Sequence, residues 1–357
     1  MKVAAVAVGS LVVVIAGSLS VASWYYSSPN GDGCARCHEM APTVSAMQAS
    51  VHRSVACIDC HEATLATKLR HIRVHLVGNW PESIRLRDVD VLKMVPDCQK
   101  CHRNEYATWH VGPHSASYAE IFTNPRQNSK QYLMDDCLRC HGMHFDGSVR
   151  DLVQPVNTAG PWHLLPKGLA DRPTMPCQTC HWIHREGLPI ARPKERISLA
   201  GAAVDDSLGF YDRRERIHFA ASALAIPQLY DGARAVKMSG DARQAICYQC
   251  HAPRKPDTST AAAVHGWGPQ AGSGDDRTPV GVHEGLSCIS CHSGHNMNVR
   301  ASCKTCHPQM SHCGLDVEKM DTTYVKPSSP HNIHRLRCTD CHQHGIPRIR
   351  MSATLKK

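Results

Sequence analysis

The chain has 357 residues, and 40 Lys and Arg against 31 Asp and Glu give it a formal net charge of +9. Only 5% of its residues are aromatic, although it carries 19 Cys and 25 His. No basic patch interleaved with aromatic side chains occurs, so the positive charge does not indicate a nucleic-acid partner. The cysteines and histidines are therefore the residues from which the function of the chain has to be inferred.

The first feature along the chain is an uncharged, apolar run at residues 3–22, preceded by Lys2 and followed by Trp24, Tyr25 and Tyr26. It is long enough to span a bilayer, and the aromatic residues after it are typical of a membrane interface. We expect a retained single-pass anchor in the cytoplasmic membrane, with the bulk of the protein on the periplasmic side. A cleavable signal peptide is the alternative, because residues 20–22 resemble a small-residue cleavage site.

The pattern Cys-x-x-Cys-His then occurs nine times, whereas random placement of these residues would give about 0.07 copies. This pattern is the attachment signal for haem c: the two thiols form thioether bonds, and the histidine binds the iron. In chain order, motif 1 to motif 9 consist of Cys34, Cys37 and His38; Cys57, Cys60 and His61; Cys98, Cys101 and His102; Cys137, Cys140 and His141; Cys177, Cys180 and His181; Cys247, Cys250 and His251; Cys288, Cys291 and His292; Cys303, Cys306 and His307; and Cys338, Cys341 and His342.

Zinc and disulfide bonds are the alternatives for a cysteine-rich chain, but neither requires a histidine directly after each second cysteine. The motifs also use every cysteine except Cys313, which we interpret as an inert thiol or an unusual iron ligand. We therefore expect nine covalently bound haem c groups.

Nine haems in this length amount to about one per 40 residues, which is too little chain for a separate core around each. The expected fold is a multihaem cytochrome c, with mostly short α-helices and loops wrapped on a haem chain, one N-terminal transmembrane helix and essentially no sheet. The expected domains are a membrane anchor (1–26), a region for haems 1–3 (27–110), a region for haems 4–5 (111–191), a haem-free helical connector (192–246) and a region for haems 6–9 (247–357).

The first 110 residues resemble the membrane-anchored quinol dehydrogenases of the NapC/NirT and NrfH family. The shared features are the single N-terminal helix, motif 1 soon after it, a methionine two residues beyond the motif 1 histidine, the Ser-x-His before motif 2 and the GNWPESIRLRD phrase at residues 78–88. The resemblance implies that haem 1 accepts electrons from a quinol. It also implies that Met40, and not His38, is an axial ligand of haem 1, and it makes Lys68, Asp88 and Asp90 the candidate quinol residues.

Sixteen histidines remain after the nine in the motifs, so every haem could have a second imidazole ligand. Many of them recur three residues after a motif histidine or four to five residues before a motif. A histidine three residues after the proximal ligand points away from its own haem and is placed to reach an adjacent iron. The expected distal ligands are His52, His114, His144, His184, His218, His283, His295, His334 and His344, with His71, His75, His110, His163, His265, His312 and His331 in reserve.

The longest gap between motifs holds residues 210–238, where a helical periodicity is interrupted by Pro227 and by Asp231-Gly232. Further on, Asp275 and Asp276 lie in a glycine-rich stretch that either forms a plain turn or helps to bind a calcium ion.

Three functions fit these features. The first is electron transfer from the quinone pool or a membrane respiratory complex to a periplasmic redox protein. The second is a reductase of a small nitrogen or sulfur oxyanion, which needs an iron with an open position. The third is a haem relay subunit of a larger respiratory complex.

Overall fold

The computed structural model describes residues 2–26, 32–61, 64–78, 86–184, 208–231, 233–251, 262–265, 276–295, 299–307, 316, 319–323, 329–341 and 344. The chain divides into two compact units. Unit 1 comprises Met1–Ile190 and Asp205–Ala220, and unit 2 comprises Ala191–Val204 and Ala221–Lys357. Motifs 1–5 therefore belong to unit 1 and motifs 6–9 to unit 2.

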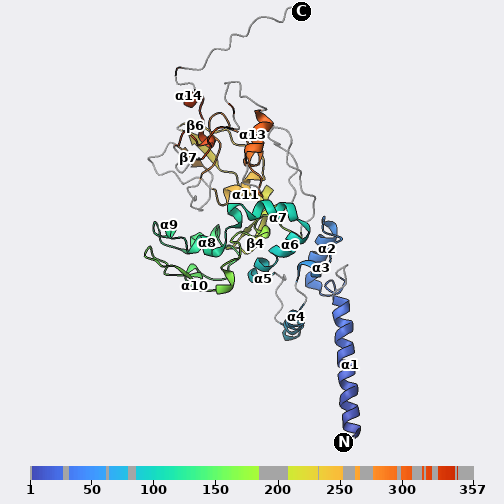
Figure 1. Ribbon diagram of the computed structural model, residues 1–357. Helices are drawn as coiled ribbons and strands as arrows, with labels where there is room; N and C mark the ends of the chain where they lie inside the picture. The colour runs from blue at the N-terminus through green and yellow to red at the C-terminus, as the bar shows by residue number, and fades with distance from the viewer. Residues whose placement is uncertain are drawn as a thin grey trace, which may run out of the picture. The chain divides into compact units, whose positions relative to one another are not determined.

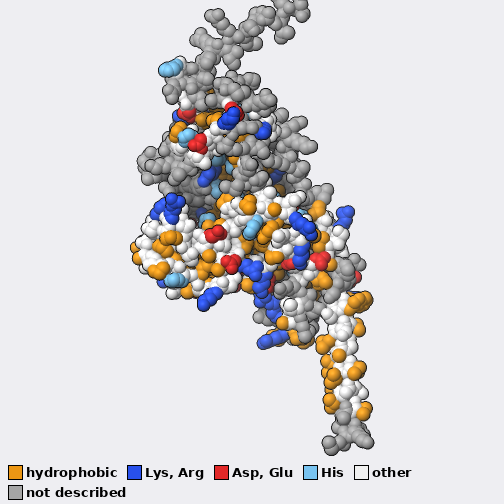
Figure 2. All heavy atoms as spheres, viewed as in Figure 1, with side chains coloured by type: hydrophobic (Ala, Val, Ile, Leu, Met, Phe, Trp, Pro, Cys, Tyr) orange, Lys and Arg blue, Asp and Glu red, His pale blue; other side chains and the backbone are white. Residues whose placement is uncertain are grey.

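The chain begins with its longest described helix, α1 (Lys2–Tyr26), which stands apart as a single rod in Figure 1. Its apolar side chains are exposed along its length, as Figure 2 shows, and Val13, Val21 and Trp24 are between 66% and 78% exposed. Residues 6–25 are long and apolar enough to cross a membrane. An N-terminal helix of this composition is either a membrane anchor or a signal peptide.

The other described helices are short. In unit 1 they are α2 (Ala41–Ala49), α3 (Cys57–Cys60), α4 (Leu65–Val77), α5 (Asp88–Lys93), α6 (Val95–Cys101), α7 (Arg103–His110), α8 (Tyr118–Phe122), α9 (Pro125–Asn128) and α10 (Val149–Leu152), with 3-10 turns η1 (His38–Met40), η2 (Pro113–Ser115), η3 (Asp135–Arg139), η4 (Lys167–Leu169) and η5 (Cys177–Thr179). In unit 2 they are α11 (Gln244–Tyr248), α12 (Cys288–Cys291), α13 (Arg300–Cys306) and α14 (Cys338–Cys341), with η6 (Ala221–Ala223) and η7 (Ile333–Arg335).

The buried apolar core of unit 1 surrounds motif 4. Tyr118 and Phe122 from α8 and Leu138 from within motif 4 have no exposed surface, and Leu152 and Val153 pack against them. A Ser117–Glu120 capping box starts α8, which fixes the direction in which Tyr118 and Phe122 enter this core. The core therefore holds the polypeptide around motif 4 in place through contacts that also include Leu92 of α5.

Three small antiparallel sheets are present among the described residues, which corrects the expectation of essentially no sheet. They pair β1 (Val153–Gln154) with β2 (His163–Leu164), β3 (Gly209–Asp212) with β4 (Ile217–Ala220), and β5 (Gln228–Asp231) with both β6 (Arg234–Ala235) and β7 (Ala262–His265).

The sheets also correct the helical connector expected at residues 192–246, because its described part forms β3, β4, β5 and β6. The charged residues 213–216 are the turn of the β3–β4 hairpin, and Arg216 has a positive φ of 55° there. Short apolar stretches on either side of a charged turn satisfy a helical and a hairpin pattern equally well. The pairing of Tyr211 with His218 across this hairpin matters for the site described below.

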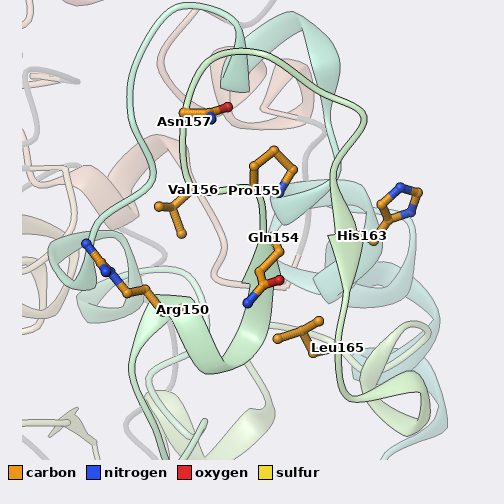
Figure 3. A pocket seen from close by; sticks show the side chains of 7 residues that line it. All are labelled: Arg150, Gln154, Pro155, Val156, Asn157, His163 and Leu165. Carbon is orange, nitrogen blue, oxygen red and sulfur yellow. The ribbon is translucent and has the colours of Figure 1, made fainter.

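A pocket of about 620 Å³ lies beside β1 and β2, lined by Arg150, Gln154, Pro155, Val156, Asn157, His163 and Leu165 (Figure 3). Arg150 and His163 stand on opposite sides of it in this view. The lining contains no motif cysteine and none of the nine expected distal histidines, so this pocket is separate from the candidate haem sites.

Candidate haem-binding sites

Motifs 2 to 8 share one backbone conformation. In each, the amide of the motif histidine donates a hydrogen bond to the carbonyl of the first cysteine, over 2.7–3.0 Å. This bond closes one helical turn, which brings residues three and four apart onto the same side of the backbone. Both thiols and the imidazole therefore project from a single turn, as attachment and ligation of one haem require. His342 of motif 9 lies outside the described residues.

Motif 1 is built differently. The amide of Cys37 donates to the carbonyl of Cys34, the amide of Met40 donates to Cys37, and the 3-10 turn η1 follows directly. The His38 side chain is 71% exposed, and its Nε2 lies 3.1 Å from a carboxylate oxygen of Glu39. Met40 is half-buried. In this conformation His38 faces a carboxylate and solvent, whereas Met40 is half-buried.

Four motif histidines face a second histidine at closely similar distances. The centroids of the imidazole rings are 6.0 Å apart for His52 and His102, 5.8 Å for His61 and His184, 6.5 Å for His283 and His307, and 5.9 Å for His292 and His334. Each pair joins one motif histidine to one expected distal ligand. Each pair also lies within a single unit.

These distances fit an iron between the two rings. A metal–imidazole bond is about 2.0 Å long and the ring centroid lies roughly 1.1 Å behind the nitrogen, so two axial imidazoles have centroids about 6.2 Å apart. The described residues therefore fit haem iron at motifs 2, 3, 7 and 8.

The protonation of these histidines favours metal binding too. The pKa of His184 is lowered to about 4, mainly by burial and also by the nearby His61 and His52. Burial, followed by the charge of His102, also lowers the pKa of His52. The neutral imidazole, which is the form that binds a metal, is therefore the favoured form at both positions.

His144 is the most completely buried candidate, with 1% of its surface exposed. Its Nδ1 lies 3.4 Å from Oδ1 of Asp88, and its ring stacks on Tyr211 with centroids 4.2 Å apart. Its Nε2 is buried and has no hydrogen-bond partner among the described residues. A buried polar atom without a partner is costly, so this nitrogen fits an iron ligand.

Three other buried polar atoms near motifs 4 and 5 have no hydrogen-bond partner among the described residues. They are the hydroxyl of Tyr118, the amide oxygen of Gln178 and the hydroxyl of Thr179, the last two lying between the cysteines of motif 5. Native proteins leave few such atoms unsatisfied, and those that occur often mark a functional site. Haem propionates are acceptors that would fit the two hydroxyls.

The remaining candidates are less clearly placed. His114 lies half-buried in η2, His295 is half-buried, and His344 is exposed. The Nε2 of His218 lies 2.6 Å from the carbonyl oxygen of Gln178, so this nitrogen already has a partner. The side chains of His71, His75, His265 and His312, as well as Cys313, lie outside the described residues, whereas His110, His163 and His331 are exposed.

Cysteines of different motifs lie close together. The thiols of Cys98 in motif 3 and Cys177 in motif 5 are near enough to shift each other's pKa, upward for Cys98 and downward for Cys177, and neither belongs to a disulfide bond. In unit 2, Cys288 of motif 7 and Cys247 of motif 6 shift each other's pKa in the same way, upward for Cys288 and downward for Cys247.

Two further cysteine pairs link motifs 1 to 3. Burial raises the pKa of Cys34 in motif 1, and the neighbouring Cys57 of motif 2 contributes to the increase. Burial raises the pKa of Cys60 in motif 2 to about 11, and the neighbouring Cys98 of motif 3 contributes to that increase. The attachment cysteines of motifs 1, 2, 3 and 5 therefore lie near one another in series.

Two of the three candidate quinol residues have described contacts. Asp88 contacts His144, and Oδ1 of Asp88 accepts a hydrogen bond from the Tyr211 hydroxyl over 3.0 Å. Asp90 forms an ion pair with Arg87, with Nε and Oδ2 separated by 2.6 Å. The side chain of Lys68, in α4, lies outside the described residues, so the quinol site stays a prediction.

The candidate calcium ligand Asp276 is also engaged. Its Oδ2 lies 2.7 Å from a guanidinium nitrogen of Arg335, and its Oδ1 accepts a hydrogen bond from the amide of Thr278. Asp275 lies outside the described residues. Among the residues whose side chains are described, no group of three His, Cys, Asp or Glu forms a cluster that could hold a calcium or zinc ion.

The model of the cytochrome c554 and c-prime family matches residues 97–159 of this chain. The match includes motifs 3 and 4, with His114, His144 and the buried core around Leu138. No curated protein and no solved structure matches the chain. The motif geometry and the match together define the class: the chain contains a c-type cytochrome domain and is an electron-transfer protein with covalently bound haem c.

Two residues beside the candidate haem ligand His144 were not predicted for that position. Tyr211 lies in the segment expected to be a helical connector, and Asp88 was expected near a quinol. Their contacts with His144 join segments far apart in the sequence. No local pattern could have indicated them, because nothing in the residues around Asp88 records its distance from His144.

Proposed function

We propose that this protein is a membrane-anchored cytochrome with nine haem c groups, which carries electrons from the quinone pool or a membrane complex to a redox protein on the periplasmic side. The observation that carries the proposal is the contact between attachment cysteines of different motifs. A thioether bond lies at the edge of the porphyrin, so contact between two such cysteines brings two porphyrin edges together. Electrons pass readily between haems whose porphyrin edges lie close together.

In unit 1, these contacts support a route through the haems of motifs 1, 2, 3 and 5. Cys34 and Cys57 link the first two, Cys60 and Cys98 the next two, and Cys98 and Cys177 the last two. The route omits motif 4, so the order of the haems in space differs from their order in the sequence. The haem of motif 4 would then be a branch beside the main line.

In unit 2, the contact of Cys247 with Cys288 supports a close pair formed by the haems of motifs 6 and 7. The axial pairs extend this series. His283 precedes motif 7 but faces His307 of motif 8, and His334 precedes motif 9 but faces His292 of motif 7. In each case, a histidine that precedes one motif would bind the haem iron of another motif. Such ligands would hold motifs 7, 8 and 9 together.

Entry of electrons at motif 1 is supported by α1 and by the conformation of that motif. An anchor in the cytoplasmic membrane would hold motif 1 near the membrane surface, where quinol is available. Methionine in place of histidine raises the reduction potential of a haem, which suits an acceptor of quinol electrons. The half-buried Met40 and the exposed His38 are compatible with this exchange of ligands.

A second candidate function is the reduction of a small oxyanion, which the buried hydroxyl of Tyr118 favours. This side chain has no exposed surface, burial raises its pKa, and its hydroxyl has no partner among the described residues. A neutral buried hydroxyl is a suitable donor to an anion bound at iron. This function requires a five-coordinate haem, whereas electron transfer alone does not.

The experiment is the reduction of the purified holoprotein by a menaquinol analogue in detergent. The proposal predicts rapid reduction of the haems, and loss of this reduction when residues 1–26 are removed although dithionite still reduces every haem. If no quinol reduces the intact protein, quinol oxidation belongs to another subunit. A high-spin ferric signal that changes when nitrite or sulfite is added would instead support the reductase.

A further inference from the structure

Asp88, His144 and Tyr211 form a buried group that electron transfer through the cysteine contacts does not explain. The Asp88 side chain is 12% exposed, and that of His144 is 1% exposed. Asp88 begins α5, His144 follows motif 4, and Tyr211 lies on β3, so three separate elements of unit 1 meet here. Such a group has to be assembled by the tertiary fold.

The hydrogen bonds fix which nitrogen of His144 is available. Nδ1 faces Oδ1 of Asp88 at 3.4 Å, and a carboxylate can only accept, so Nδ1 carries the proton. In a neutral imidazole, Nε2 then has the lone pair. That nitrogen is buried and has no partner among the described residues.

Three groups lie close to the carboxylate of Asp88. His144 and the Tyr211 hydroxyl both approach Oδ1, and a guanidinium nitrogen of Arg216 lies 3.7 Å from Oδ2. Two hydrogen-bond donors and a guanidinium group therefore face the carboxylate of Asp88, which itself faces Nδ1 of the imidazole.

We propose that His144 is an axial ligand of a haem iron in unit 1 through Nε2, and that Asp88 is a positioning residue that lowers the reduction potential of this haem. The inference rests on the proposed function, because it requires covalently bound haem. A carboxylate that accepts the other ring proton fixes the orientation of a metal-binding imidazole and makes it a stronger donor. An imidazole that donates electron density more strongly stabilises ferric relative to ferrous iron, so the reduction potential of the haem falls.

We assign His144 to the haem of another motif, as its spacing of three residues from His141 predicts. The recipient is a neighbouring haem of unit 1. The haems of motifs 2 and 3 already face His184 and His52. The proposal thus concerns the haem of motif 1 or of motif 5.

Tyr211 gives the proposal a second test, of opposite sign. Its hydroxyl donates to the same oxygen of Asp88 that faces His144, so it competes for the carboxylate charge. Removal of the hydroxyl alone, by Tyr211→Phe, keeps the stacked ring. The carboxylate then interacts more strongly with the imidazole, and the potential of the haem falls.

The experiment is a redox titration of the intact holoprotein, followed by electron paramagnetic resonance, with Asp88→Asn, Tyr211→Phe and the control Asp90→Asn. Asp90 lies on the same helix and pairs only with Arg87 among its described ion pairs. Asp88→Asn is expected to raise the potential of one haem by at least a tenfold change in the ferric-to-ferrous ratio, which is ~59 mV for one electron. Tyr211→Phe is expected to lower the same potential, and Asp90→Asn to leave all potentials unchanged.

Unchanged potentials in both Asp88→Asn and Tyr211→Phe would overturn the inference and leave the proposed function intact. If Asp88→Asn does not mature to the holoprotein, Tyr211→Phe still tests the inference. A lowered potential of one haem supports it, and an unchanged or raised potential refutes it. The intact mass of the unsubstituted protein tests the proposed function separately: a chain without covalent haem would refute that function before any variant is made.

Discussion

The imidazole rings of His61 and His184 lie 5.8 Å apart, although His61 belongs to motif 2 and His184 follows motif 5. The distance is that of two axial ligands on one iron, and the low pKa of His184 keeps its ring neutral. A ligand donated from so far along the chain joins the region of haems 1–3 to the region of haems 4–5. A single iron bound by both rings would make haem ligation part of the tertiary structure of unit 1.

Replacement of His184 by alanine should remove the distal ligand from the haem of motif 2. The haem stays attached, because its thioether bonds do not involve this residue. We expect one low-spin ferric haem to become high-spin, as measured by electron paramagnetic resonance, while the number of haems per chain stays the same. The control is His163→Ala, since His163 is exposed and lies beside a pocket without a motif cysteine. An unchanged low-spin signal in His184→Ala would refute this pairing.

The contact between Cys98 and Cys177 predicts magnetic coupling between the haems of motifs 3 and 5. Replacement of both cysteines of motif 5 by alanine removes that haem. We expect the spectrum of the motif 3 haem to lose the broadening that coupling produces. The matched control removes the haem of motif 4 through Cys137 and Cys140, and it should leave the motif 3 signal coupled. The opposite pattern would mean that electrons follow the sequence order of the motifs.

Unit 2 contains a buried ion pair that should matter for stability. The side chains of Asp241 and Arg243 are 5% and 7% exposed, with Oδ2 and a guanidinium nitrogen 2.9 Å apart. Asp241→Asn leaves a buried charge without its partner, which costs about 3 kcal/mol. Denaturant unfolding at pH 7 measures this loss. Asp231→Asn is the control, because its contacts with Arg234 and Arg337 are 3.5–3.6 Å long and more exposed, so it should cost less than about 1 kcal/mol.

The same pair predicts a pH dependence. Burial raises the pKa of Asp241, but hydrogen bonds from Arg243 outweigh it and leave the pKa below its ordinary value. The stabilisation is then complete above the pKa of the unfolded chain, about 3.9, and disappears as the pH falls through the lower folded value. The difference between wild type and Asp241→Asn should shrink below about pH 4. A difference that stays constant down to pH 3 would show that the carboxylate charge is not responsible.

The helix α1 predicts a membrane-bound mature protein. If it is an anchor, the protein should sediment with membranes, resist extraction by high salt and retain residues 2–26 in its intact mass. Detergent should release it, because only apolar contacts hold it. A mature chain that begins at Ser23 and remains soluble would show that this helix is a signal peptide.

Local features were predictable from the sequence, and long-range features were not. The turn of motifs 2 to 8 depends on five adjacent residues, and the apolar run that forms α1 is continuous, so both could be predicted. His52, His184, His283 and His334 were chosen by their spacing from the motifs, and in the structure each faces a motif histidine. Which one it faces depends on contacts between segments that the spacing does not record. The hairpin at residues 209–220 was misjudged because its short apolar strands and charged turn also fit a helical period.

The most direct test of the account is the intact mass of the protein after maturation in a host that assembles c-type cytochromes, combined with an absorption spectrum. The account predicts a red protein whose mass exceeds that of its polypeptide by nine haems, and by eight when the two cysteines of any one motif are replaced by alanine. A colourless protein with the mass of its amino acids alone would contradict it.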